Sequence, residues 1–347
     1  MTATDTDQDD AIAFLRSHDT RGPSPVDDVV QTHGALVFLH QNDALKIKRA
    51  VKYDYLDFST LPLRKKMLIR ELELNQDAAP GLYHEVIALR RKPDGTCGFD
   101  GNGPVVEWVL RMTRFPAEDE LLAFADRGQI DDRLADDLGQ AIAQYHRGTK
   151  PSTEDGRVLI REILEELGRV MGEMDAQLGA EAVQDFLAAC NTALGRANPL
   201  LQSRSKAGWV RRCHGDLHLR KIVMWRGVPT PFDALEFDER LGTCDVLYDL
   251  AFLLMDLSHQ NLGPAANLTL NAYLLSSDTT DHYAGLAALP LYLAVRAGIR
   301  AMVDVQTAVV QNDPPELLAE ARWFLQQALV FLTPTSPVLI AIGGLSG

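Results

Sequence analysis

The sequence has few cysteines, and none of them lies at a spacing that binds zinc. The 347 residues include four cysteines, scattered along the chain without a CxxC pair. Scattered thiols of this kind are typical of a reducing compartment and argue against a zinc site or a disulfide framework. We therefore expect a cytoplasmic protein with reduced thiols at Cys97, Cys190, Cys213 and Cys244.

Long apolar runs and export signals are also absent. The longest apolar run, residues 284–295, is interrupted by Pro290 and is shorter than the roughly 20 residues of a spanning helix. Residues 1–10, MTATDTDQDD, are acidic and polar, which is the opposite of a signal peptide. The sequence therefore predicts no membrane association.

Positive charge is in deficit. Lys and Arg number 34 against 48 Asp and Glu, which gives a formal net charge of −14. Nucleic-acid binding requires a surplus of Lys and Arg, so we expect no nucleic-acid partner. With 46% hydrophobic and 24% charged residues, the chain has the composition of a soluble globular protein with a well-buried core. No internal repeat is evident.

A dense polar stretch stands out at residues 213–221, with the sequence CHGDLHLRK. It brings together two imidazoles, a carboxylate and a glycine, in His214, Gly215, Asp216 and His218. Asp216 is the kind of group that accepts a proton from a hydroxyl nucleophile. Gly215 permits a backbone conformation closed to other residues. The alternative interpretation is a polar turn between two strands.

Two apolar runs after this stretch predict a hairpin, with strands at residues 222–225 and 228–232 and a turn at Arg226-Gly227. Asp233 ends the second strand, so the base of the hairpin brings Asp216 and Asp233 together. Two carboxylates are what a nucleotide-bound magnesium ion needs, with phosphates completing its shell. Further carboxylates follow at Glu236, Asp238, Asp245 and Asp249. For Asp249 we favour a role in supporting the loop over a role in chemistry.

The first third of the chain predicts strands, with a hairpin formed by residues 35–40 and 44–51. In its second strand Ala44, Lys46 and Lys48 share one face, while Leu45 and Ile47 share the other. A lysine here could reach the α- and β-phosphates of a nucleotide. Two solvated lysines on an edge strand are the alternative.

The remaining elements follow from composition and periodicity. A helix is expected over residues 61–76, two more strands over 82–91 and 105–112, and a connector over 113–116. From residue 117 onward the pattern is helical, interrupted only by the polar stretch and its hairpin. This order predicts an α+β protein, rich in strands first and helical afterwards.

The stretch 214–252 resembles the aminoglycoside phosphotransferase-like family, whose members are relatives of protein kinases. The family pattern is HGD-x-x-x-x-N, a hairpin, an apolar residue followed by Asp, and later Asp-Leu-Ala. Here these read HGDLHLRK, PFD and DLAF. The resemblance implies that Asp216 is the catalytic carboxylate, with His214 beside it, and that Asp233 holds metal, with Glu236 and Asp238 as rivals.

One position departs from the family pattern, because Lys221 stands where the family has Asn. An Asn carbonyl oxygen can ligate magnesium, whereas an ammonium has only donors. Pairing of Lys221 with Asp216 or with a phosphate, in place of one metal ion, is one interpretation. Loss of activity is the other.

The resemblance covers about residues 25–330 and implies a two-lobed, protein-kinase-like fold. We expect an N-terminal extension at 1–24, a β-rich lobe at 25–115 and a helical lobe with the catalytic loop at 116–332. In the kinase-like pattern a helix carboxylate orients the strand lysine. Lys46 with Glu71 is the preferred pair, and Lys48 and Glu73 are the alternates. The resemblance also implies a hinge between the lobes at Arg114 and Phe115, whose backbone groups would meet the adenine, and the alternative is that both are ordinary connector residues. His218 is a candidate phosphate contact.

The function implied is an ATP-dependent, magnesium-assisted phosphotransferase acting on a hydroxyl of a small molecule. Lys221 motivates an alternative, a degenerate kinase-like module that binds nucleotide or regulates a neighbour with little or no turnover. A pure interaction domain is a third and weaker hypothesis.

The last residues, 333–347, predict a linker, a strand at 338–342 and a glycine-rich end, 343–347. A strand followed by Gly344 resembles the opening of a P-loop without its lysine. The combination is similar to a bacterial group in which the phosphotransferase-like domain is fused to a C-terminal P-loop ATP-binding domain. We therefore expect a chain truncated inside the P-loop, with that domain as a partner in the full-length protein. A flexible tail is the alternative.

Overall fold

The computed structural model describes residues 5–53, 56–277, 279–310 and 314–334. The predicted strand at 338–342 and the glycines after it lie outside these residues. The chain forms two compact units. The first comprises residues up to 154 together with 205–283, and the second comprises 155–204 and the residues from 284 onward.

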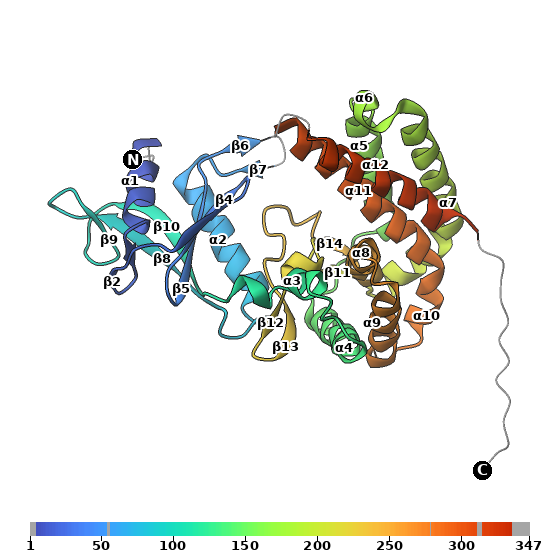
Figure 1. Cartoon of the computed structure of the whole chain (residues 1–347), viewed down its shortest axis with the longest axis horizontal. Coiled ribbons are helices and arrows are strands. Elements are labelled where there is room, and N and C mark those ends of the chain that lie inside the picture. The colour runs from blue at the N-terminus through green and yellow to red at the C-terminus, as the bar shows by residue number, and fades with distance from the viewer. Residues whose placement is uncertain (1–4, 54–55, 278, 311–313, 335–347) are drawn as a thin grey trace, which may run out of the picture. The chain divides into compact units, whose positions relative to one another are not determined.

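The first unit begins with a six-stranded antiparallel sheet (Figure 1). Its strands in spatial order are β3 (Asp28–Gln31), β4 (Ala35–Leu39), β5 (Asp43–Lys48), β10 (Val105–Thr113), β8 (Tyr83–Arg91) and β9 (Cys97–Gly98). Two short pairs accompany it, β1 (His18–Asp19) with β2 (Gly22–Pro23) and β6 (Lys52–Tyr53) with β7 (Leu56–Asp57). The predicted hairpin and the two later strands are confirmed.

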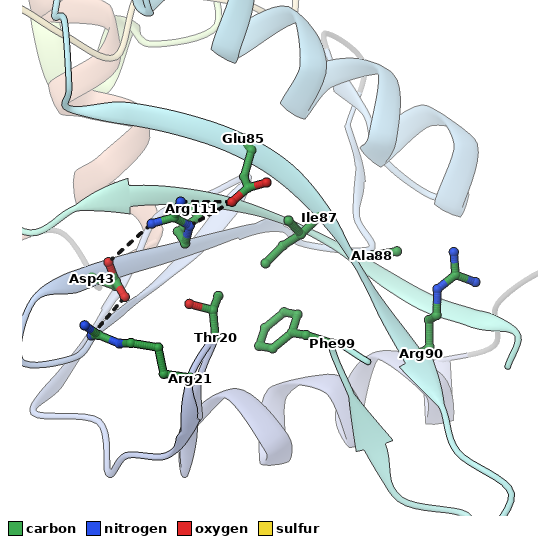
Figure 2. Close-up of a pocket in the computed structure, with 9 residues that line it drawn as sticks. All are labelled: Thr20, Arg21, Asp43, Glu85, Ile87, Ala88, Arg90, Phe99 and Arg111. Carbon is green, nitrogen blue, oxygen red and sulfur yellow. Dashed lines mark hydrogen bonds and ion pairs between the residues drawn. The ribbon is translucent and has the colours of Figure 1, made fainter. Parts of the chain in front are cut away.

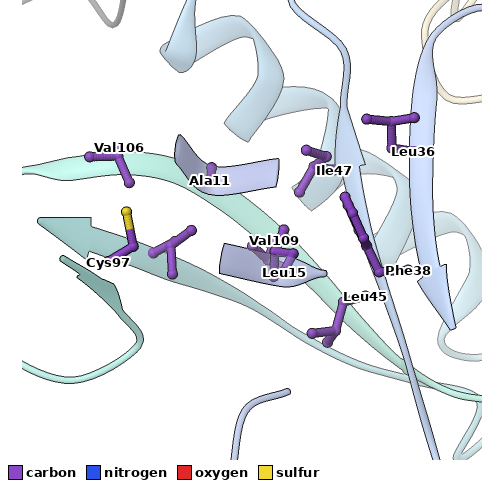
Figure 3. Packing of buried hydrophobic residues seen from close by; sticks show 10 residues of the cluster. Ala11, Leu15, Leu36, Phe38, Leu45, Ile47, Cys97, Val106 and Val109 are labelled. Carbon is purple, nitrogen blue, oxygen red and sulfur yellow. The ribbon is translucent and has the colours of Figure 1, made fainter. Parts of the chain in front are cut away.

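Strand β5 separates an apolar face from a charged one. Leu45 and Ile47 belong to a buried cluster with Leu15 of helix α1 (Asp5–Leu15), and Figure 3 shows them side by side with the neighbouring strands. The opposite face carries Lys46 and Lys48, which are also buried. The alternation predicted from the sequence is confirmed, but these lysines are not solvated as the alternative interpretation assumed.

Helix α2 (Leu61–Asn75) begins after Thr60 with a proline in its first turn, a position where the missing N–H of proline costs nothing. The buried residues of this helix are Arg64, Leu68, Glu71 and Asn75. Three of them are polar or charged, so the buried face of the helix is largely polar. Arg64 is matched by Glu107 of β10, at 2.9 Å from its Nε. The buried face of α2 therefore carries charges into the interior, and these charges need partners.

A hollow of about 650 Å³ lies on the apolar side of the sheet (Figure 2). Arg111 pairs there with Glu85 and with Asp43, and Asp43 also pairs with Arg21. Arg111 is the register partner of Leu45, whereas Leu110 is the partner of Lys46. The hollow and the buried lysines are therefore on opposite faces of the sheet.

The helical part of the first unit surrounds the polar stretch. Its elements are η1 (Ala117–Asp119), α3 (Leu121–Asp126), α4 (Asp132–Gly148), β11 (Val210–Arg212), η2 (Leu219–Lys221), β12 (Ile222–Trp225), β13 (Val228–Pro231), β14 (Thr243–Asp245), α8 (Val246–His259), α9 (Gly263–Ser276) and α10 (Asp281–Gly285). Helices α4 and α9 touch closely because Gly139 has no side chain. A Cβ there would lie 2.3 Å from the carbonyl oxygen of Thr269.

The second unit is helical. It contains α5 (Gly156–Met171), α6 (Asp175–Leu178), most of α7 (Ala180–Lys206), η3 (Leu286–Ala288), α11 (Leu289–Val310) and α12 (Pro315–Leu332). Gly298 of α11 lets the ring of Phe186 approach, since a Cβ at Gly298 would lie 2.4 Å from that ring. The α+β order predicted from the sequence, strands first and helices afterwards, is confirmed.

The helical stretch Asp281–Val309 has the length and the apolar composition of a membrane-spanning helix. Half of its most apolar window is buried, and core helices of soluble proteins meet the same criteria. Buried Arg296 and Asp304 lie within this stretch.

The acid Asp304 makes the second unit sensitive to pH. Burial raises the pKa of Asp304 to about 6, against the opposing charge of Arg300, whose Nη2 lies 3.1 Å from Oδ1. The folded state therefore holds a proton that the unfolded chain releases above about pH 4. This contribution to stability is present below pH 4 and is lost as the pH rises through 6.

We expect Asp304→Asn, which cannot ionise, to raise the Tm relative to the parent by a few degrees more at pH 7.5 than at pH 4.5. Thermal unfolding followed by circular dichroism at both pH values measures this difference. Asp185→Asn, on an exposed position of α7, is the matched control. A difference in Tm that is independent of pH would contradict the assignment.

Candidate active site

Two carboxylates of α8 hold the loop at residues 213–221, and one of them, Asp256, accepts the N–H of Leu219 at 2.8 Å. Asp249, in the first turn of α8, accepts hydrogen bonds from the backbone N–H groups of His214 (3.0 Å) and Gly215 (2.9 Å). Gly215 has a φ of +85°, which a residue with a side chain rarely adopts. The supporting role predicted for Asp249 is confirmed by these two bonds.

Asp249 is itself oriented from behind. His146 of α4 places Nε2 at 3.1 Å from Oδ2 of Asp249, and its Nδ1 lies 3.0 Å from the hydroxyl of Tyr273 in α9. The sulfur of Cys213 completes a buried group with His146 and Asp249. Because both oxygens of Asp249 already accept backbone N–H bonds, this group serves the loop rather than offering free metal ligands.

Asp216 follows the loop glycine and remains accessible, with 39% of its side chain exposed. Burial acts to raise its pKa, but the hydrogen bond from His218 and the charges of His218, Lys221 and His214 outweigh burial and hold the pKa well below its usual value. His218 Nε2 lies 3.5 Å from Oδ2 of Asp216. A carboxylate that stays ionised at neutral pH therefore faces outward from the loop.

Asp233 begins the segment after the hairpin in an unusual conformation, with a φ of +59°. Two residues from other elements hold the backbone in place. The N–H of Asp233 donates to the hydroxyl of Tyr83 in β8, and the N–H of Ala234 donates to Oδ1 of Asn75 in α2, both at 3.0 Å. The carboxylate of Asp233 is thereby aimed at the buried lysines.

Both strand lysines bind the same helix carboxylate. Lys46 Nζ lies 2.6 Å from Oε1 of Glu71, and Lys48 Nζ lies 2.6 Å from Oε2. Lys46 also contacts Asp233 at 2.7 Å, and Lys48 contacts Glu236 at 2.6 Å. Burial lowers the pKa of Lys46, but the charges of Asp233 and Glu71 raise it well above its ordinary value. The preferred Lys46–Glu71 pair is present, and Lys48 joins it instead of replacing it.

Lys221 binds Asp233, through Nζ and Oδ2. The expected ion pair with Asp216 is thus replaced by one with Asp233. Pairing of Lys221 with a phosphate stays a prediction. Burial lowers the pKa of Lys221, whereas the charges of Asp233 and Asp216 raise it, with a net increase. Lys221 and Lys46 in turn hold the pKa of Asp233 well below its usual value, against the effect of burial.

The other predicted residues are distributed as follows. His214 is buried, and its Nε2 lies 2.9 Å from the carbonyl oxygen of Phe232. Asp238 accepts the N–H groups of residues 240 and 241, so it forms a turn.

Glu73 pairs with Arg70 on the exposed side of α2. Phe115 packs edge-on against Phe232 at 5.1 Å, whereas the guanidinium of Arg114 contacts Asp27 and the carbonyl of His40.

Sequence reasoning missed Tyr83, Asn75, His146 and Glu120. The first three act through backbone groups or through Asp249, and no motif marks them. Glu120 precedes α3 and is half-buried near the polar stretch. Burial raises its pKa, against the charges of Arg220, Lys221 and His218. The one signal that the sequence offered was spacing, since Asn75 follows Glu71 by four residues and therefore lies on the same face of the predicted helix.

The donors in this site do not match a two-metal nucleotide centre. Both oxygens of Asp233 contact ammonium groups, and Glu236 contacts Lys48. Position 221 offers an ammonium in place of an oxygen, and like charges a few Å apart disfavour each other. Magnesium, with its strict demand for oxygen ligands, would have to displace a lysine to bind Asp233.

Comparison with known proteins identifies the fold. A choline kinase of Cryptosporidium parvum matches with a TM-score of 0.58 over 94% of this chain and 95% of its own, at 11% identity. A choline/ethanolamine kinase family protein of Mesorhizobium loti gives 0.54 over 94% and 95%, at 15% identity. APH(2")-IIIa, in a complex with GDP and kanamycin, gives 0.53 over 88% and 94%, at 13% identity. The protein therefore has the protein-kinase-like fold of aminoglycoside phosphotransferases and choline kinases.

The relatives found by sequence are longer than this chain, and their descriptions name no activity. Proteins of Mycobacterium tuberculosis and Mycobacterium bovis, both described as uncharacterized, are 27% identical over 328 residues, which is 93% of this chain. The chain spans 63% of the length of these curated relatives. No family model matches the sequence.

Gly215 offers a test of how tightly the loop is built. A Cβ at Gly215 would lie 3.1 Å from Cα of Gly242 and 3.2 Å from Cβ of Leu235, whereas Gly227 has a similar φ of +83° with nothing within 4 Å. Gly227→Ala should cost about 1 kcal/mol of unfolding free energy from backbone strain alone. Gly215→Ala should cost more, about 2–3 kcal/mol, because strain and contact add. Urea unfolding of both variants decides this, and equal losses would contradict the close packing.

Proposed function

We propose that this protein binds a nucleoside triphosphate such as ATP and transfers a phosphoryl group to a hydroxyl of a small molecule. The observation that carries the proposal is the contact of Lys46 on β5 with Asp233 after the hairpin, at 2.7 Å. Lys221 contacts Asp233 as well and lies close enough to Asp216 for the two charges to interact. Phosphoryl transfer needs mainly positioning and neutralisation of charge, and these groups can supply both. The fold of small-molecule kinases supports the same class of reaction.

Lys46 is the group suited to the phosphates. An ammonium has three donors, and contacts to Glu71 and Asp233 use two of them. The third donor can reach a phosphate oxygen while Glu71 keeps the side chain oriented. Lys48, with 3% of its side chain exposed, is the less accessible of the two lysines.

Asp216 is suited to the acceptor. Its lowered pKa keeps it ionised at neutral pH and also makes it a weak proton acceptor. Its main contribution would therefore be to orient the attacking hydroxyl, with proton uptake late in the transfer. The acceptor belongs to the broad class of hydroxyl-bearing small molecules.

The nucleobase would lie near the connector after β10. Phe115 packs on Phe232, in an apolar cluster with Ala44, Met112 and Val223. The N–H of Arg114 is already engaged by the carbonyl of Asn42, so Phe115 is the better source of a backbone contact to adenine.

A degenerate nucleotide-binding module is the second candidate, and the Lys221–Asp233 contact favours it.

The greater length of the mycobacterial relatives supports a further domain in the full-length protein, for which a P-loop ATP-binding domain remains our proposal. Buried free thiols in all four cysteines suit a reducing compartment such as the cytoplasm.

The paired lysines provide the first test of nucleotide binding. ATP should raise the Tm of the parent protein, because a ligand that binds only the folded state stabilises it. Lys46→Met should weaken ATP binding at least about tenfold, a loss of about 1.4 kcal/mol for one phosphate contact. Lys48→Met should lower the Tm at least as much as Lys46→Met does, because Oε2 of Glu71 and Oε1 of Glu236 both lose their ammonium contact. It should nevertheless change the ATP affinity only a few-fold. Calorimetric titration of both variants measures the affinities, and the reverse order would place Lys48 on the phosphates.

Asp216→Asn tests the transfer step separately from binding. ATP consumption with a panel of hydroxyl compounds should fall by about 10²–10⁴-fold, while the ATP affinity stays within a few-fold. Asp100→Asn, an exposed partner of Lys92, is the control. If the variant consumes ATP like the parent, Asp216 has no role in transfer. If no compound stimulates the parent, the degenerate module is the better description.

A further inference from the structure

Asp233 has two ammonium groups on its two carboxylate oxygens. Lys46 contacts Oδ1 and Lys221 contacts Oδ2. About a quarter of the Asp233 and Lys221 side chains is exposed, so the pair lies at the open side of the buried cluster. The side chain of Lys221 is therefore more exposed than those of Lys46 and Lys48, at 10% and 3%.

The charges of this cluster cancel without any metal. Lys46, Lys48 and Lys221 contribute three positive charges, and Glu71, Asp233 and Glu236 contribute three negative ones, joined in one continuous series of contacts. A divalent cation would add two positive charges to six groups that already cancel, and the negative charge of Asp216, which acts on Lys221, would offset only one of the two. The cation would also have to compete with Lys221 for the same oxygen atom.

The phosphates of a nucleotide, unlike a metal ion, would not compete with Lys221, because they accept hydrogen bonds from its ammonium group. An ammonium donates three hydrogen bonds, so Lys221 can keep Asp233 and still donate to a phosphate oxygen. Lysine acts as a compact point charge on a flexible stem, which suits it to follow a phosphate. Two lysines on either side of Asp233 can thus provide the positive charge that a metal ion usually provides.

We propose that this site binds the phosphates of a nucleoside triphosphate through Lys46 and Lys221, with Lys221 in the place of a divalent cation, so that binding does not require the metal. The inference rests on the proposed nucleotide binding and adds the form in which the nucleotide is recognised. It concerns binding alone and holds whether or not turnover follows.

The test is calorimetric titration of ATP into the protein, in one buffer with millimolar MgCl₂ and in another with EDTA. For the parent we expect dissociation constants that agree within about threefold. For Lys221→Asn, which restores an oxygen ligand and removes a charge, ATP should bind at least about tenfold more tightly with MgCl₂ than with EDTA. Lys221→Arg keeps the charge, so its dissociation constants for ATP with MgCl₂ and with EDTA should agree as closely as those of the parent.

Two further variants serve as controls for the loss of charge at position 221 and for the loss of any lysine. Lys221→Met removes the charge without adding an oxygen ligand, so it should weaken ATP binding in EDTA and regain less of it with MgCl₂ than Lys221→Asn does. Lys92→Asn removes a lysine that pairs with Asp100 elsewhere and should behave like the parent. Thermal unfolding of each variant confirms that it is folded before titration.

The possible failures are distinguishable. ATP binding by the parent that requires MgCl₂ would overturn the present inference and leave the proposed function intact. No ATP binding in either buffer would overturn the proposed function and this inference with it. A Lys221→Asn variant that binds ATP equally well in both buffers would show that Lys221 does not stand in for the metal.

Discussion

Glu71 is a carboxylate with no exposure to water, and the arrangement around it depends on how its charge is balanced. Moving a carboxylate into the interior is costly unless ammonium groups and hydrogen bonds compensate it. Lys46 and Lys48 supply that compensation from β5 and then carry the contacts on to Asp233 and Glu236. One series of alternating charges thus joins the sheet, helix α2 and the segment after the hairpin. Removing a single member would leave a buried charge uncompensated, which typically costs about 3–5 kcal/mol.

The two accessible carboxylates of the site are kept ionised in different ways. Asp233 is in direct contact with ammonium groups, whereas Asp216 is influenced by a hydrogen bond to His218 and by charges farther away. Asp216 therefore stays ionised through His218 on Oδ2 and with more than a third of its side chain exposed, whereas both oxygens of Asp233 contact ammonium groups. The same formal charge at two positions suits two different roles because the partners differ.

Much of this arrangement could be predicted from the sequence, because it is encoded locally. Periodicity identified the helices, alternation identified the two faces of β5, and the HGD stretch with its hairpin identified the loop. The binding of both lysines to Glu71 could not be predicted, since strand geometry places Lys46 and Lys48 on one face without saying which reaches the helix. The contributions of Tyr83 and Asn75 could not be predicted either, because each accepts a backbone N–H from a distant part of the chain. The separation along the sequence is 150 residues for Tyr83 and 159 for Asn75. Such contacts exist only once the tertiary fold is formed.

The partner of Lys221 is a different case, because the hairpin itself determines it. The turn at Arg226-Gly227 pairs Trp225 with Val228 and Ile222 with Pro231, and the N–H of Phe232 then donates to the carbonyl of Lys221. Whatever side chain occupies position 221 therefore lies next to Asp233. An amide there adds an oxygen to a metal site, whereas an ammonium adds a positive charge that competes with the metal. The backbone of the hairpin thus sets where the group at position 221 acts. The chemistry of that group decides whether Oδ2 of Asp233 faces a cation from solution or one from the chain, while Oδ1 contacts Lys46.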